Sequence, residues 1–214
     1  PIPAPTPSNS IKVYVSAYRK DAKINRISID VHIIDVLLQL DGTERGKVVR
    51  GFKASSDDVV LPYLFYLPMD YTPKGRLPLL IALNPTYSDE PNKLDVYFNY
   101  GLAQHADAEG FAVMCLNGSP EVEWDEVIVH NVLDALTIVQ SRLPIDVDQI
   151  YLFGAGRGGD VAYKLGLQYP DIFAAMAVAE GVGPADLTKN ALNLPLYIVN
   201  GVWPGANYNE LQSF

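Results

Sequence analysis

The feature that most constrains this fold is a regular alternation of apolar runs and amphipathic segments between residues 77 and 200. Residues 77–84 (LPLLIALN) form an almost uninterrupted apolar run, which is typical of a strand buried on both faces of a sheet. Residues 121–142 carry valine, leucine and isoleucine at helical spacing, which predicts a helix with one apolar face. Strands that alternate with helices imply a parallel sheet with right-handed crossovers. The sequence therefore predicts an α/β fold.

The same patterns predict the other elements of this region. We expect helices at 94–109 and 160–169, and strands at 111–116, 149–153, 173–179 and 196–200. Earlier in the chain, residues 47–54 and 59–67 flank the polar cluster Ser55-Ser56-Asp57-Asp58. Two strand-like runs around such a turn predict an antiparallel pair.

The composition divides the chain into three parts. Residues 1–10 include four prolines in the first seven positions, which predicts an extended linker or a terminus left by processing. Residues 11–46 form a small N-terminal element. There, alternation at 27–33 is typical of a strand, whereas apolar spacing at 33–40 is typical of a helix, and we favour a helix over 30–40. Residues 47–214 form the main domain.

Charge and composition exclude several function classes. The chain has 16 basic and 25 acidic residues, a net charge of −9, which speaks against binding to nucleic acid or to an anionic membrane surface. A neutral or cationic small molecule remains compatible with this charge. No segment reaches the ~18 consecutive apolar residues of a membrane span. The single cysteine and three widely spaced histidines predict no metal site, and we expect no cofactor.

A glycine-rich turn, Gly154-Ala155-Gly156-Arg157-Gly158-Gly159, joins a predicted strand to a predicted helix. One interpretation is a dinucleotide-binding fingerprint, G-x-G-x-x-G, made by Gly154, Gly156 and Gly159. Glu180 then closes the following strand, near the place expected for a ribose-binding acid. This fingerprint normally follows the first strand of its sheet, whereas here at least two central strands come before it.

The other interpretation of this turn is a nucleophile elbow. In that motif, G-x-S-x-G, a strained serine lies between a strand and a helix, and the N–H of the next residue helps to form the oxyanion hole. Gly154, Gly156 and Gly158 have the required spacing, with glycine in place of the serine.

The segments around the turn favour the elbow, because five of them resemble one family in the correct order. Residues 61–68 look like its "PYRLYLP" strand, and residues 76–83 resemble its "YPLVVALHG" strand. Residues 145–152 are similar to the start of "IDPDRIYLTGHSMGG", residues 168–175 to "YPDRFAAIAPVSG", and residues 193–201 to "LPVLIVHGEKD". The chain thus resembles the secreted bacterial esterases of the α/β-hydrolase superfamily, in the prolyl-oligopeptidase-like branch that includes polyhydroxybutyrate depolymerase-like and feruloyl esterase-like proteins.

The sequence departs from this family at the positions that carry hydrolysis. Gly156 has no side chain to attack a carbonyl, and Ala155 stands where a histidine is usual. The family's His-Gly after the first central strand is Asn84-Pro85 here, and Pro85 has no N–H to donate to an oxyanion. No aspartate follows in residues 201–205, no histidine follows His130, and the chain stops at Phe214, short of the strand and helix that usually end the fold.

We therefore expect an α/β-hydrolase-type domain with no assignable catalytic residue. Arg157 and the backbone N–H groups at the start of its helix are suited to hold a carboxylate or phosphate, and the other interpretation of Arg157 is an ordinary surface arginine. The predicted binding region consists of seven residues: Asn84, Thr86, Tyr87, Ser88, Gly156, Arg157 and Trp203.

Four hypotheses follow from the sequence. The favoured one is a catalytically impaired relative of serine ester hydrolases that binds a small-molecule ester or carboxylate. The others are an active hydrolase with an unrecognised or partner-completed site, a dinucleotide-binding domain, and an interaction domain. In the last case, the sheet edge at residues 196–200 would pair with another copy of the chain. The family resemblance also suggests a secreted or periplasmic protein, whereas the composition leaves the compartment open.

Overall fold

The computed structural model describes residues 11–15, 18–19, 22–23, 27–31, 42–55, 60–85, 94–116 and 126–201. The chain separates into two compact units, residues 1–39 and residues 40–214. Gly46, which the sequence analysis placed at the end of the N-terminal element, begins the first strand of the larger unit, β5.

The described part of the first unit consists of two short antiparallel pairs. β1 (Ile11–Val15) pairs with β4 (Ile27–Val31), and β2 (Tyr18–Arg19) pairs with β3 (Ala22–Lys23). The helix predicted over 30–40 is wrong at residues 30 and 31, which belong to β4. The period-two pattern of β-branched residues in β4 favours a strand over a helix at these positions. The rest of that predicted helix lies outside the described residues.

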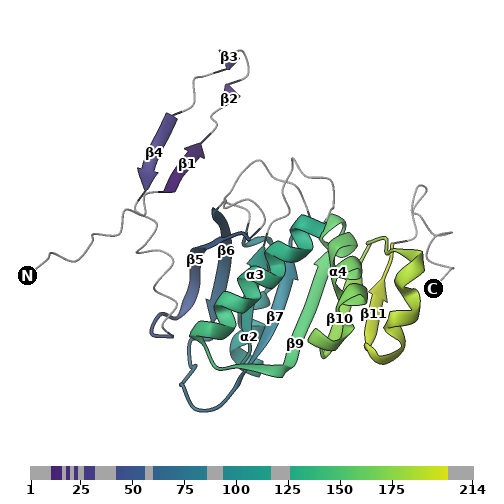
Figure 1. Cartoon of the computed structure of the whole chain (residues 1–214). Helices are drawn as coiled ribbons and strands as arrows, with labels where there is room; N and C mark the ends of the chain where they lie inside the picture. The colour runs from purple at the N-terminus through teal and green to yellow at the C-terminus, as the bar shows by residue number, and fades with distance from the viewer. Residues whose placement is uncertain are drawn as a thin grey trace, which may run out of the picture. The chain divides into compact units, whose positions relative to one another are not determined.

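The second unit is built on a seven-stranded sheet in the order β11-β10-β9-β7-β8-β6-β5 (Figure 1). Its strands are β5 (Gly46–Lys53), β6 (Val60–Leu67), β7 (Leu77–Leu83), β8 (Ala112–Leu116), β9 (Ile145–Ala155), β10 (Ala175–Ala179) and β11 (Leu196–Val199). β5 and β6 pair antiparallel, and β6 pairs antiparallel with β8. The five strands from β11 to β8 are parallel. The predicted mostly parallel α/β sheet, preceded by an antiparallel pair, is confirmed.

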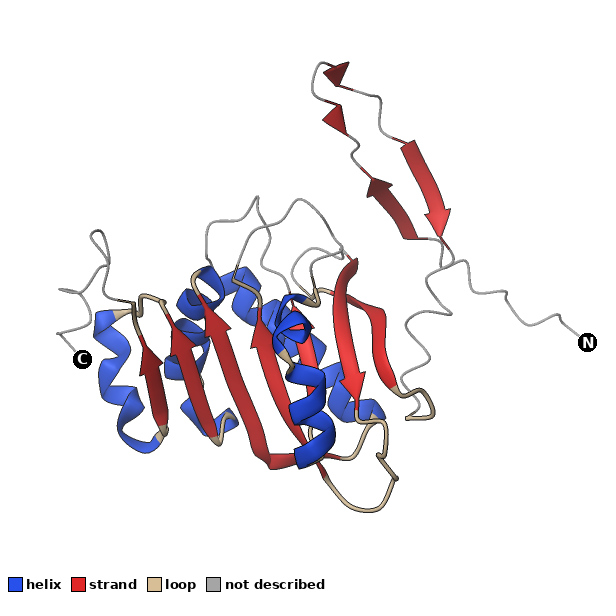
Figure 2. Ribbon diagram, turned by 180° about the vertical axis from the view of Figure 1, so that it is seen from behind, coloured by secondary structure: helices blue, strands red, loops and turns tan. Residues whose placement is uncertain are grey.

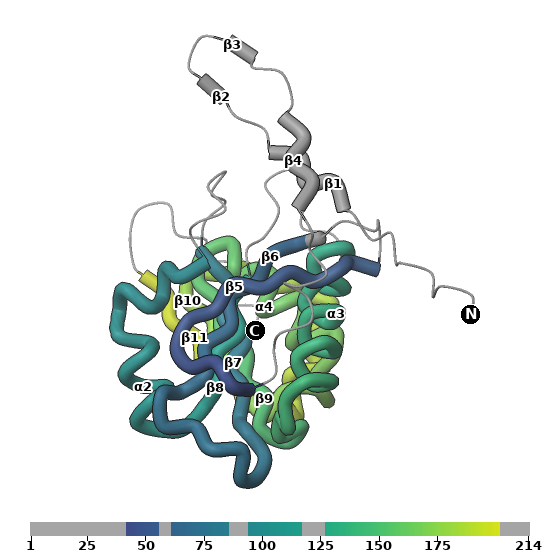
Figure 3. The backbone as a smooth tube through the Cα atoms, turned by 90° about the vertical axis from the view of Figure 1, so that its left-hand side faces the viewer, coloured from purple at the N-terminus to yellow at the C-terminus, as the bar shows by residue number. Residues whose placement is uncertain are grey.

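Helices connect these strands on both sides of the sheet. They are η1 (Val96–Tyr100), α2 (Leu102–Glu109), α3 (Glu126–Arg142), α4 (Arg157–Gln168), η2 (Pro170–Ile172) and η3 (Ala185–Asn193). The helix predicted at 94–109 is split, because Gly101 adopts a left-handed conformation with φ 87° between η1 and α2. α2 lies on one side of the sheet and α3 on the other (Figure 3). None of the described helices is long and apolar enough to cross a membrane.

β7 explains why its segment is so uniformly apolar. Leu77, Leu79, Ile81 and Leu83 point into the larger core cluster, which also contains buried residues of α3 and α4. Leu80 and Ala82 alternate with them and pack in a second cluster with residues of η1 and α2. Both faces of this strand are therefore covered, as expected for a central parallel strand.

The sheet is covered less completely towards β11. In Figure 2 the strands β9, β10 and β11 lie in view with no described helix in front of them. Tyr197 and Val199 of β11 are 68% and 46% exposed. β11 is the last strand of the described sheet, at the edge expected from residues 196–200. Pairing of this edge with another copy stays a prediction.

Shortening a buried side chain of the central strand tests this description of the core. Ile81 is fully buried, and Ile81→Ala should lower the free energy of unfolding by about 2–5 kcal/mol, the cost of lost burial and a cavity. Val147→Ala removes an apolar side chain that is 56% exposed in β9, and should change stability by less than about 0.5 kcal/mol. Urea denaturation measures both, and equal losses would contradict the assignment of the core.

Candidate functional site

The turn after β9 has the backbone of an elbow. Gly156 joins Ala155, the last residue of β9, to Arg157, the first residue of α4, with φ 51° and ψ −122°. This combination is sparsely populated by residues that carry a Cβ. Hydrogen bonds on both sides fix the turn. The Gly156 N–H donates to the carbonyl of Ala179 in β10 (2.7 Å), and the Asp160 N–H donates to the carbonyl of Gly156 (3.1 Å).

The flanking glycines permit close packing of α4 on the sheet. A Cβ on Gly154 would lie 2.1 Å from the carbonyl oxygen of Gly158, and a Cβ on Gly158 would lie 2.1 Å from that of Leu83 in β7. The start of α4 therefore lies against the backbone of β9 and β7 at distances that no other residue allows. This packing also explains why α4 begins at Arg157, three residues before the predicted start. Gly158 and Gly159, which look like turn residues in the sequence, are inside this helix.

Gly156 differs from Gly154 and Gly158, because its backbone angles disfavour a side chain more than the surrounding atoms do. A Cβ at this position would lie 3.3 Å from the carbonyl oxygen of Pro85, a tight but adjustable contact. The surroundings of Gly156 thus leave nearly enough room for a side chain.

The same packing bears on the dinucleotide hypothesis. A Cβ on Gly159 would lie 3.0 Å from the Cα of Gly181, so this glycine also has a packing role. Glu180 is exposed after β10, with φ 58°, and its N–H donates to the carbonyl of Val199 (2.9 Å). Packing and backbone geometry account for these glycines without a nucleotide, and dinucleotide binding stays a prediction.

A tyrosine that the sequence analysis missed connects the two strands next to the elbow. The Tyr97 hydroxyl donates to the carbonyl of Leu83 (2.6 Å) and accepts from the N–H of Ala155 (3.2 Å). Its ring packs on Phe153, with ring centroids 4.9 Å apart. Burial raises the pKa of Tyr97, so the hydroxyl keeps the proton that it donates. No sequence signal identifies this role, because Tyr97 is far from both partners along the chain.

Three residues of the predicted binding region are described, and they gather at the carboxyl ends of β7 and β9. Asn84 follows β7, is 3% exposed, and donates its N–H to the carbonyl of Leu116 (3.2 Å). Gly156 and the exposed Arg157 follow β9. The remaining predicted site residues, Thr86, Tyr87, Ser88 and Trp203, lie outside the described residues.

Asp160, in the first turn of α4, holds the segment after β10. Its Oδ1 accepts a hydrogen bond from the N–H of Val182 (2.7 Å). Burial raises the pKa of Asp160, while this hydrogen bond and the Arg157 guanidinium act in the opposite direction. The carboxylate therefore fixes a loop and is partly withdrawn from solvent.

In the part of the chain that the structure describes, the single cysteine is inaccessible and no metal-binding cluster is found. Cys115 is fully buried in β8, where it packs as a small apolar residue, and burial raises the pKa of its thiol. Within the described ranges, no group of three or more His, Cys, Asp or Glu side chains is arranged to hold a metal ion.

Known structures share this fold. No protein-family model and no curated sequence matches the chain. A thermostable esterase superposes with a TM-score of 0.67 at 17% identity, over 78% of this chain and 50% of that protein. FphF, a fluorophosphonate-binding serine hydrolase of Staphylococcus aureus, superposes with a TM-score of 0.64 at 17% identity. The match covers 79% of this chain and 84% of FphF. The S954A feruloyl esterase module of Clostridium thermocellum, complexed with sinapinate, gives 0.62 at 12% identity, over 78% and 71%.

These superpositions define the class of fold. The second unit has the α/β-hydrolase fold, shared with esterases and serine hydrolases. The chain spans half the length of the thermostable esterase that it matches. At these identities the likeness establishes architecture, and the activity is argued separately from the site.

Three glycine-to-alanine variants separate crowding from backbone strain. Gly156→Ala should cost about 1–3 kcal/mol, because its backbone angles disfavour a Cβ. Gly158→Ala should cost more than Gly156→Ala, because the new methyl meets the backbone of β7. Gly110→Ala, at φ 72° with open space around it, should cost about 1 kcal/mol. Urea denaturation gives the order, and a neutral Gly158→Ala would contradict the close packing of α4.

Proposed function

We propose that this chain binds a small-molecule ester or carboxylate at its elbow and does not hydrolyse it through a serine nucleophile. One observation carries the proposal: the turn at Gly156 has an elbow backbone between β9 and α4, while the nucleophile position has no side chain. The fold is shared with esterases and by itself does not distinguish binding from hydrolysis.

The chemistry of ester hydrolysis explains why Gly156 matters. A serine hydrolase forms an acyl-enzyme when the serine Oγ attacks the ester carbonyl, while a histidine removes its proton. Glycine offers no Oγ, so no acyl-enzyme forms at this position. Pro85, next to the elbow, also has no N–H to donate to the oxyanion of the intermediate.

Binding requires fewer groups than hydrolysis, and the start of α4 retains them. The first N–H groups of a helix have no acceptor within the helix, and the positive end of the helix dipole favours an anion. Arg157, exposed at the first position, adds a guanidinium that suits a carboxylate. A fold neighbour lends support, since its serine-to-alanine variant was captured with sinapinate, an aromatic carboxylate.

The test separates binding from hydrolysis in the whole chain. We expect no labelling by a fluorophosphonate, and measurable sinapinate binding in an NMR titration, with shifts at the amides of Arg157 and Gly158. Arg157→Gln should weaken binding roughly fivefold, the effect of an exposed charge pair near 1 kcal/mol. Lys189→Gln, an exposed lysine in η3, removes the same charge elsewhere and should leave the affinity unchanged.

Two outcomes would overturn the proposal. Labelling by the fluorophosphonate would show that a nucleophile exists outside the elbow, and the chain would be an active hydrolase. Equal affinities for sinapinate in Arg157→Gln and the unmodified chain, or shifts confined to other parts of the sheet, would remove the elbow as the binding site.

A further inference from the structure

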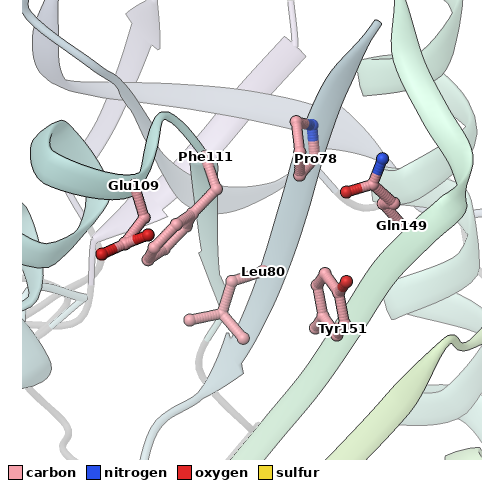
Figure 4. Close-up of a pocket in the computed structure, with 6 residues that line it drawn as sticks. All are labelled: Pro78, Leu80, Glu109, Phe111, Gln149 and Tyr151. Carbon is pink, nitrogen blue, oxygen red and sulfur yellow. The ribbon is translucent and has the colours of Figure 1, made fainter.

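A second concave site lies away from the elbow, on the side of the sheet that carries α2. We call it the β7–β9 groove. It has a volume of about 330 Å³ and is lined by six residues, drawn in Figure 4: Pro78, Leu80, Glu109, Phe111, Gln149 and Tyr151. Leu80 pairs with Tyr151 across β7 and β9. Tyr151 precedes Gly156 by five residues, about 16 Å along a strand that rises about 3.3 Å per residue, so the groove and the elbow are separate.

The groove combines an apolar floor with polar walls. Leu80, Pro78 and the ring of Phe111 supply the apolar surface between the strands and α2 (Figure 4). Glu109 lies on one wall, and Gln149 and Tyr151 on the other. Ligand sites have this composition, in which a few polar groups orient a molecule on apolar surface.

A hydrogen bond outside the groove determines which atom Gln149 presents. The amide nitrogen of Gln149 donates to the Oδ2 of Asp146 (2.9 Å). Asp146 is itself held, because its Oδ1 accepts from the N–H of Asp148 (3.2 Å) and lies 3.7 Å from the Arg76 guanidinium. The amide oxygen of Gln149 is then turned towards Pro78, on the groove side (Figure 4). This wall therefore offers a hydrogen-bond acceptor.

The opposite wall is negative. Glu109 is the last residue of α2, at the negative end of the helix dipole, and the last turn of α2 has no basic residue. Of the six lining side chains, only Glu109 is charged, and the whole chain has a net charge of −9. A carboxylate or phosphate ligand would be repelled here, whereas a cation would be attracted.

We propose that the β7–β9 groove binds a small organic cation, a primary amine attached to an aromatic or other apolar body. The ammonium group donates to the Glu109 carboxylate, and the body packs on Phe111 and Leu80 and extends towards the Gln149 wall. The Phe111 ring, which lies next to Glu109 in Figure 4, adds attraction for the cation. The volume is at the lower end of the range for ligand pockets, about 300–1,000 Å³, and this favours a small molecule over a segment of another protein.

Phenethylamine, phenylacetate and 2-phenylethanol test the charge selectivity, because they share one body and differ in the head group. An NMR titration of the whole chain should give a dissociation constant on the order of 1 mM for phenethylamine, as expected for a fragment. Shifts should fall on Leu80, Phe111 and Tyr151. Phenylacetate should leave these signals unchanged, and 2-phenylethanol should bind more weakly than the amine.

Charge-removing variants test the assigned wall. Glu109→Gln should weaken phenethylamine binding about fivefold, the effect of one exposed charge pair, without changing sinapinate binding at the elbow. Asp186→Asn removes the same charge from η3 and should leave the affinity unchanged. Unchanged affinity in Glu109→Gln, equal shifts with phenylacetate, or shifts at Ala155–Arg157 would overturn the proposal. Binding that weakens as protein concentration rises would show that a second copy covers the groove, and would also overturn it.

Discussion

The backbone contact between α4 and the two central strands is the constraint on which the rest of the structure depends. Gly154 and Gly158 allow the start of the helix to lie directly against β9 and β7, where a single methyl group would meet a carbonyl oxygen at 2.1 Å. With the helix that close, the chain must turn sharply after Ala155. Gly156 then takes backbone angles that residues with a side chain rarely adopt. Tyr97 reinforces the arrangement, because its hydroxyl bonds to both strands beside the turn.

This geometry is that of an elbow whose central residue is a glycine. In a nucleophile elbow the strained turn exposes a serine, and the strain is part of the function. In this chain Gly156 adopts these backbone angles without the strain of a Cβ, and under the proposed function it offers no nucleophile. The positive end of α4 and Arg157 remain, and they suit binding of a carboxylate. The β7–β9 groove has the opposite electrostatic character, so the two proposed sites select ligands of opposite charge.

The sequence predicted the architecture better than the sites, for physical reasons. The apolar run at 77–84 and the alternation of strands and helices after it follow directly from burial. The parallel sheet and the order of its elements along the chain could therefore be predicted. The helix over 30–40 failed at residues 30 and 31, because a short apolar stretch fits two periods. The roles of Tyr97 and of the Gln149 amide depend on partners that are distant in sequence or on a side-chain orientation, and no local pattern encodes either. Four predicted site residues lie outside the described residues.

A high-resolution crystal structure of the chain tests the central claim most directly, through the backbone of residues 154–158. The account predicts φ near 51° and ψ near −122° at Gly156, with Gly158 packed against the carbonyl of Leu83. An ordinary helical or extended conformation at Gly156, with α4 standing off from β7, would contradict it. In that case the turn would be a simple loop, and the proposal of a binding elbow without a nucleophile would lose its basis.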